Sequence, residues 1–254
     1  MRRLLLFAIC LSACAVGARA QTMMDLSTID LGIQQIQDNT FVFNSINQSM
    51  AVNSGDSGRT NSRRRPAPGQ PNGGGTGGGT GHPVAAAQTT FRPVAASIMP
   101  QRLATQMGRT PEERARLEKF FAGLLKDYKE MAVERRAPLN DVARASSFAV
   151  GTSYDVYNEG RLLGERAFQS MREQMYDALA ASRKFQALDD RQRQEMYESY
   201  VILGMFVSAA YESANKSHDA ELAAKMRKLA RIQLEGAFGV PVERLRFTDE
   251  GVRF

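Results

Sequence analysis

Residues 200–211 read YVILGMFVSAAY, and this stretch decides the expected fold. A surface helix carries one apolar stripe, whereas here apolar side chains cover nearly every face of a helix. The capping box Asp189-x-x-Gln192 lies just upstream and predicts where this helix starts. We therefore expect a helix over about 190–216 at the centre of a helical domain.

The clearest helix start in the chain is Thr110-Pro111-Glu112-Glu113. Thr110 and Glu113 can form a capping box, and proline suits the first helical position. An apolar stripe at three- and four-residue spacing follows and predicts a helix that ends near 135–136. Further helices are expected over about 140–157, 164–182 and 219–238, with a weaker signal over about 97–106.

The expected architecture is an all-α bundle of five or six helices over 91–254. No strand-like period and no internal repeat is evident in this range, and the residues after Pro241 read as a turn or short packing segment. Small residues at 143–149 predict that a neighbouring helix approaches the 140–157 helix closely.

Two segments of different composition precede this domain. Residues 53–90 hold 10 of the 21 glycines and 4 of the 9 prolines and contain no Leu, Ile, Met, Phe or Tyr. Such a stretch cannot bury enough apolar surface to offset chain entropy, so we expect a disordered linker. Residues 21–52 form a polar N-terminal segment that fits either a short strand at 40–43 or a helix, and part of it can be ordered against the domain.

Residues 1–20 read as a secretory signal peptide. Arg2 and Arg3 precede an apolar run, and a small-x-small site predicts cleavage between Ala20 and Gln21. Leu11-Ser12-Ala13-Cys14 also has the form of a lipobox, so lipidation at Cys14 is the alternative. We expect an exported bacterial protein, periplasmic or secreted, with an outer-membrane lipoprotein as the alternative location.

Cysteine content and charge narrow the chemistry. Both cysteines, Cys10 and Cys14, lie in the predicted signal peptide, so we expect no disulfide, Cys-containing zinc site or Cys nucleophile in the mature chain. The formal charge of +6 falls by three when the signal arginines are removed. No basic patch remains in the sequence, and we expect no nucleic-acid partner, no cofactor and no transmembrane segment in the mature chain.

Several residues that suggest chemistry have simpler interpretations. The G-x-G-x-x-G match at 73–78 lacks the strand and helix that dinucleotide binding requires. His218 fits a capping turn, and Ser146-Ser147 fits close packing. Glu195 and Glu198 alternate with Arg and Gln, which predicts a solvated helix face rather than a catalytic pair.

Tyr154, Tyr157 and Arg161 are the candidate partner contact. Two tyrosines three residues apart stand at a predicted helix end, beside polar residues and a loop, as is typical of a contact surface. The alternative is that both rings pack into the core with their hydroxyl groups at its rim.

Four short motifs carry a resemblance to a known kind of protein. They are Asp141-Val142-Ala143-x-Ala145, Ser153-Tyr154-x-Val156-Tyr157-Asn158, Phe185-x-x-Leu188-x-Asp190-x-x-x-Gln194 and Ile202-Leu203-Gly204. Over about 89–251 the chain resembles a family of exported bacterial proteins of unknown function, which join a signal peptide, a low-complexity stretch and a helical C-terminal domain. The resemblance implies bacterial export and assigns no site.

We therefore expect a non-catalytic protein of the cell envelope that binds a partner, with no catalytic, cofactor-binding or metal-binding residue. One alternative is a hydrolase that uses buried carboxylates. The other is a lipid-anchored envelope protein held through Cys14.

Overall fold

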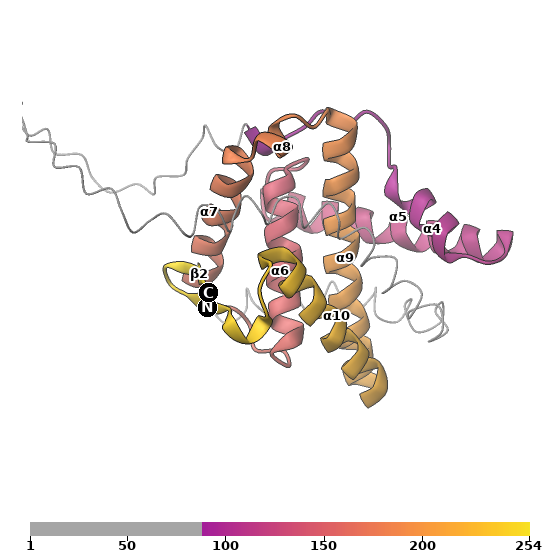
Figure 1. Ribbon diagram of the computed structural model, residues 1–254. Coiled ribbons are helices and arrows are strands. Elements are labelled where there is room, and N and C mark those ends of the chain that lie inside the picture. The colour runs from indigo at the N-terminus through magenta and orange to yellow at the C-terminus, as the bar shows by residue number, and fades with distance from the viewer. Residues whose placement is uncertain (1–87) are drawn as a thin grey trace, which may run out of the picture.

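The computed structural model describes residues 88–254, which form a helical bundle (Figure 1). The all-α prediction is confirmed: this part of the chain contains six helices of nine or more residues and one single-turn helix. The seven are α4 (Met99–Met107), α5 (Pro111–Glu134), α6 (Val142–Tyr157), α7 (Glu165–Ala181), α8 (Arg183–Gln186), α9 (Asp190–Ser217) and α10 (Ala220–Phe238). None of them is long and apolar enough to cross a membrane.

Several predictions concern residues before this domain. The signal peptide at 1–20, the cleavage between Ala20 and Gln21, the lipidation of Cys14, the segment 21–52 and most of the linker lie outside the described residues.

Helix α9 is the central helix, as its apolar stretch predicts. Helices α6 and α10 pack along it (Figure 1), and Val201 and Val207 are completely buried. Both predicted capping boxes are present, with Thr110 at the start of α5 and Asp189 at the start of α9. These boxes satisfy backbone N–H groups that have no partner inside the helix, which is why they mark the helix starts so clearly.

Helices α4 and α5 form a hairpin that projects to one side of the bundle (Figure 1). Met99, Leu103 and Met107 of α4 are buried, as are Leu117 and Phe121 of α5, and the same apolar cluster includes buried residues of α9. The hairpin is thereby continuous with the main core.

The C-terminal segment contains more regular structure than the sequence predicts. A 3₁₀ turn, η1 (Val242–Arg244), leads into a two-stranded antiparallel sheet of β1 (Arg246–Thr248) and β2 (Gly251–Arg253). The side-chain oxygen of Gln174 on α7 accepts a hydrogen bond of 2.7 Å from the backbone N–H of Val252. Three-residue strands are too short to show an alternating period, so this hairpin leaves no clear signal in the sequence.

The domain also begins earlier than residue 91. Thr89 is completely buried and its hydroxyl donates to the Asp141 carboxylate at 2.8 Å. The N–H of Phe91 donates to the carbonyl of Asn140 at 3.1 Å. Residues 88–90, which composition assigns to the linker, are thus part of the packed domain.

Candidate functional site

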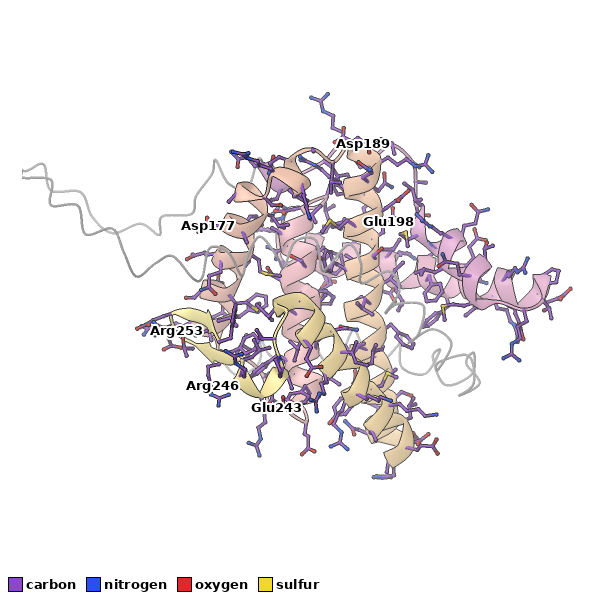
Figure 2. The ribbon with its side chains drawn as sticks, viewed as in Figure 1. Asp177, Asp189, Glu198, Glu243, Arg246 and Arg253 are labelled. Atoms are coloured by element: carbon purple, nitrogen blue, oxygen red, sulfur yellow. The ribbon has the colours of Figure 1, made fainter. Side chains whose placement is uncertain are left out.

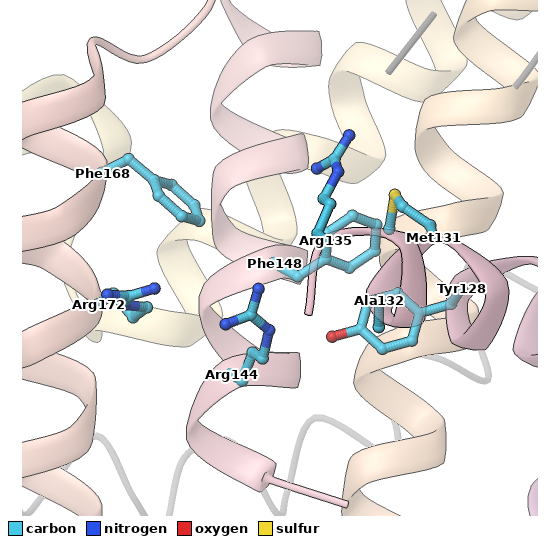
Figure 3. A pocket seen from close by; sticks show the side chains of 8 residues that line it. All are labelled: Tyr128, Met131, Ala132, Arg135, Arg144, Phe148, Phe168 and Arg172. Atoms are coloured by element: carbon cyan, nitrogen blue, oxygen red, sulfur yellow. The ribbon is translucent and has the colours of Figure 1, made fainter. Parts of the chain in front are cut away.

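A pocket open to solvent lies where helices α5, α6 and α7 meet (Figure 3). Its volume is about 80 Å³. Helix α5 and its C-cap contribute four lining residues, and α6 and α7 contribute two each. The lining residues are Tyr128, Met131, Ala132, Arg135, Arg144, Phe148, Phe168 and Arg172.

Two glycines position the aromatic side chains of this pocket. A Cβ atom added at Gly151 of α6 would lie 2.9 Å from Cε2 of Phe168, and one added at Gly204 of α9 would lie 2.8 Å from Cε1 of Phe148. Both phenyl rings therefore lie directly against a helix backbone. The ring of Tyr128 packs on Phe148 with 4.9 Å between centroids, which is typical of tilted aromatic pairs.

The polar groups of the pocket are three arginines and one tyrosine hydroxyl, and no lining residue is acidic. Arg135 is the exposed C-cap residue of α5, whereas Arg144 and Arg172 are partly buried on α6 and α7. Figure 3 shows the guanidinium groups of Arg144 and Arg172 extending into the space between these two helices. The pocket is therefore cationic with apolar walls.

Arg172 carries a buried N–H that the fold leaves without a partner. One of its terminal nitrogens donates to the side-chain oxygen of Gln169, while its buried Nε has no hydrogen-bond acceptor among residues 88–254. Buried donors without a partner are uncommon, because losing water without a replacement costs about 1–3 kcal/mol. The bond to Gln169 fixes one side of a guanidinium whose side chain lines the pocket.

The hydroxyl of Tyr128 remains neutral over the whole physiological range. Burial raises its pKa to about 12, and the Asp141 carboxylate adds to this effect, while Arg144 beside the hydroxyl opposes it. Tyr128 can therefore serve the pocket as a neutral hydrogen-bond donor. It adds no negative charge to offset the arginines.

Asp141 forms a buried polar cluster at the start of α6. Its carboxylate is completely buried and accepts hydrogen bonds from the hydroxyls of Thr89 and Tyr176 and from the backbone N–H of Arg144. Burial raises the pKa of Tyr176 well above its usual range, and the hydrogen bond to Asp141 raises it further. Asp141 is therefore engaged in capping α6 and joining it to α7 and to the first described residues.

The structure places Tyr154, Tyr157 and Arg161 away from the pocket, toward the C-terminal end of α6. The ring of Tyr154 packs on Phe247 of β1 with 4.5 Å between centroids, and Tyr157 packs against buried apolar residues of the core. Both tyrosines are partly exposed, and Arg161 is exposed in the following loop. Their role as a partner contact stays a prediction.

Glu198 is not on a solvated face, and that prediction is wrong. It is 4% exposed, and its carboxylate accepts hydrogen bonds of 2.8 Å from the N–H groups of Ile98 and Met99, which cap the start of α4 (Figure 2). Glu195 does lie at the surface, where it pairs with Arg102 and Arg191. The two glutamates thus have opposite roles on one helix.

The simpler interpretations of His218 and of the paired serines agree with the structure. His218 is the C-cap of α9 in the left-handed conformation, and Asp219 caps α10. The hydroxyls of Ser146 and Ser147 both donate to the carbonyl of Ala143, at 2.9 and 2.7 Å. Because these serines are buried and bonded within their own helix, α6 approaches its neighbours closely, as predicted.

Burial in the fold changes the protonation of the Asp155 carboxyl group. It follows Tyr154 on α6, and its Oδ1 accepts a hydrogen bond of 2.9 Å from the N–H of Leu163. Burial raises its pKa from 3.8 to about 6, although the Leu163 N–H partly opposes this. The folded protein therefore holds this proton more tightly than the unfolded chain does.

Asp155→Asn is expected to stabilise the protein by about 1–3 kcal/mol at pH 7 and to have little effect at pH 4. The stability contributed by the protonated Asp155 is complete below pH 3.8 and is lost as the pH rises through about 6. Asparagine keeps the acceptor for Leu163 without the charge. Urea unfolding at several pH values from 4 to 7 measures this, and a difference that does not grow with pH would contradict it.

Asp177→Asn is the matched control. Asp177 is exposed on α7, so its substitution is expected to change the free energy of unfolding by less than about 0.5 kcal/mol throughout this pH range. A pH-dependent gain in this variant would show that the effect at Asp155 reflects net charge rather than burial.

Two signals in the sequence could have indicated the arginine pocket. Arg144 and Phe148 are four residues apart, as are Phe168 and Arg172, and this spacing places each pair on one helix face. The sequence does not reveal that the two pairs face one another. Within residues 88–254, the structure brings together no group of three or more His, Cys, Asp or Glu residues that could hold a metal ion.

Comparison with known proteins gives a family and no assigned activity. The model of a family of unknown function, DUF6683, matches residues 1–254. No curated protein and no solved structure matches the chain.

Proposed function

This chain belongs to the family of unknown function DUF6683, and we propose that it is an exported bacterial protein whose helical domain binds an envelope partner without catalysis. The observation that carries the proposal is the pocket of Arg135, Arg144 and Arg172 between aromatic walls. Arginine binds carboxylates and phosphates through a rigid fork of donors, so this lining suits an anionic group on the partner.

The buried carboxylates support binding over hydrolysis. A hydrolase of the alternative kind needs two carboxyl groups across a substrate site, one of them with a raised pKa. Asp141 and Glu198 are both buried, and both accept hydrogen bonds from backbone N–H groups that start helices. The pocket itself is lined by no carboxyl group, and Asp155 is not among its lining residues.

Export is supported by the sequence of residues 1–20, with its arginine start, apolar run and Ala18-Arg19-Ala20 site. Mass measurement of the mature protein distinguishes the two processing routes. A chain that starts at Gln21 excludes lipidation, whereas an acylated Cys14 establishes a lipid-anchored envelope protein.

A photo-crosslinking side chain at position 131 is expected to capture the partner in intact cells. Met131 lines the pocket and is uncharged, so its replacement leaves all three arginines in place. The adduct should be lost when Arg144→Gln and Arg172→Gln are added, because the anionic group then loses its donors. An adduct that survives both changes would contradict a role for the pocket in partner binding.

The tyrosine cluster is tested in the same way from Leu162. This residue is 51% exposed and adjoins Arg161. An adduct at position 162 that disappears with Arg161→Ala would place Tyr154, Tyr157 and Arg161 in the partner contact. Capture at position 131 without capture at 162 would confine the contact to the arginine pocket.

A further inference from the structure

We propose that the group bound by the arginine pocket is a phosphate monoester dianion. This inference rests on the proposed function and specifies its ligand chemistry. The three cations come from three different elements, namely the C-cap of α5 and helices α6 and α7, so they surround the pocket rather than form a row. A tetrahedral group with three terminal oxygens can meet donors from three directions, whereas a planar carboxylate offers two oxygens in one plane.

The charges of the three pocket arginines and of Asp141 together also favour a dianion. Arg135, Arg144 and Arg172 contribute three positive charges, and the buried carboxylate of Asp141 contributes one negative charge close to Tyr128 and Tyr176. The structure pairs none of these three arginines with a carboxylate in a salt bridge within residues 88–254. The three arginines and Asp141 together carry two net positive charges. A ligand with two negative charges balances them, whereas a ligand with one leaves one positive charge unbalanced.

The unfilled donors point to the same ligand. Within the described part of the chain the buried Nε of Arg172 has no acceptor, and the Gln169 side chain holds a terminal nitrogen of this guanidinium in place. The Tyr128 hydroxyl stays protonated and lies beside Arg144. The Arg172 side chain lines the pocket, so its guanidinium can donate to a phosphoryl oxygen bound there.

The aromatic walls define the rest of the ligand. Phe148, Phe168 and Tyr128 line the pocket together with the cations, so a group bound there also meets aromatic surface. The ester side of the ligand would lie against these rings. We therefore expect an aryl monoester to bind more tightly than inorganic phosphate.

Titration calorimetry of the full chain with four probes tests the ligand chemistry. The probes are phenyl phosphate, inorganic phosphate, phenyl sulfate and benzoate. Phenyl phosphate and phenyl sulfate have the same shape and differ in charge, so their ratio isolates the preference for a dianion. We expect phenyl phosphate to bind about tenfold more tightly than phenyl sulfate or benzoate. Equal binding of the three aryl anions would overturn the assignment to a phosphate monoester.

Substitution of the arginines locates the site. Arg172→Gln is expected to weaken phenyl phosphate binding by about 10- to 100-fold, and Arg135→Gln, at an exposed position, by a smaller factor. Arg166→Gln is the matched control, because Arg166 is exposed on α7 and does not line the pocket. Thermal unfolding confirms that each variant is folded. Loss of binding in Arg166→Gln equal to that in Arg172→Gln would overturn the assignment of the site.

Vesicles distinguish a lipid phosphate from a soluble one. Sedimentation with vesicles containing phosphatidic acid, a monoester, but not phosphatidylglycerol, a diester, would identify a lipid headgroup as the source. Binding of phenyl phosphate without sedimentation would identify a soluble phosphate monoester. In either case, Arg172→Gln must weaken the binding for the result to report on this pocket.

The two proposals can fail separately. If cells yield the crosslink at position 131 but phenyl phosphate shows no preference over benzoate, partner binding stands and the phosphate assignment fails. If phenyl phosphate binds at Arg172 but no crosslink forms, the anion site stands and the envelope partner fails.

Discussion

Glu198→Ala is expected to lower the free energy of unfolding by about 3–5 kcal/mol. The carboxylate accepts hydrogen bonds from the N–H groups of Ile98 and Met99 at 2.8 Å and from the side chain of Gln194 at 2.7 Å. Alanine would leave the N–H groups of Ile98 and Met99 without this acceptor, whereas the side-chain nitrogen of Gln194 keeps its bond of 2.9 Å to the carbonyl of Ala95. Urea unfolding measures the loss, and hydrogen exchange of Ile98 and Met99 should accelerate first, because their bonds are removed directly.

Glu195→Ala is the control on the same helix. Glu195 forms ion pairs with Arg102 and Arg191, and both arginine side chains are more than half exposed. Surface ion pairs contribute about 0–1 kcal/mol, so this variant should remain close to wild type. Glu198→Gln keeps one acceptor oxygen and should lie between the two. Equal losses in Glu195→Ala and Glu198→Ala would show that α4 does not depend on the carboxylate cap.

The different burial of these two glutamates could not be predicted from the sequence. Both lie in the same polar stretch of α9, among Arg and Gln residues, and nothing in that stretch separates them. Glu198 is buried because Ile98 and Met99 bring their N–H groups to it, although they lie 100 and 99 positions earlier in the chain. The helix start at Thr110 could be predicted, because Thr110 and its hydrogen-bond partner Glu113 lie only three residues apart in the sequence.

The arginine pocket could likewise be predicted only in part from the sequence. Within each helix, the four-residue spacing of an arginine and a phenylalanine is visible in the sequence. Their convergence depends on how closely the helices approach one another, and that is set by Gly151 and Gly204, which the sequence shows only as isolated glycines. Tyr154 and Tyr157 are conspicuous in the sequence, yet the structure gives Tyr154 a packing partner, Phe247, in a hairpin that the sequence does not predict.

Gly204→Val is expected to destabilise the protein by about 3 kcal/mol and to weaken anion binding as well. A Cβ atom at this position would lie 2.8 Å from Cε1 of Phe148 and 3.1 Å from Cα of Ala149. The second contact is with backbone, so α6 and α9 would have to move apart. Since Phe148 packs on Tyr128 in the pocket wall, the same displacement reaches the arginine site.

Gly123→Val is the matched control for this prediction, because a Cβ atom at Gly123 meets nothing within 4 Å on the surface of α5. Its stability should stay within about 0.5 kcal/mol of wild type, since valine is at least as favourable as glycine in a helix. Adding Phe148→Leu to Gly204→Val should recover part of the stability, because the shorter side chain relieves one of the two contacts, but it should not recover phenyl phosphate binding. If stability and phenyl phosphate binding recover together, the phenyl ring of Phe148 has no role in the pocket. If stability alone recovers, the packing of α6 on α9 and the formation of the anion site are separate effects.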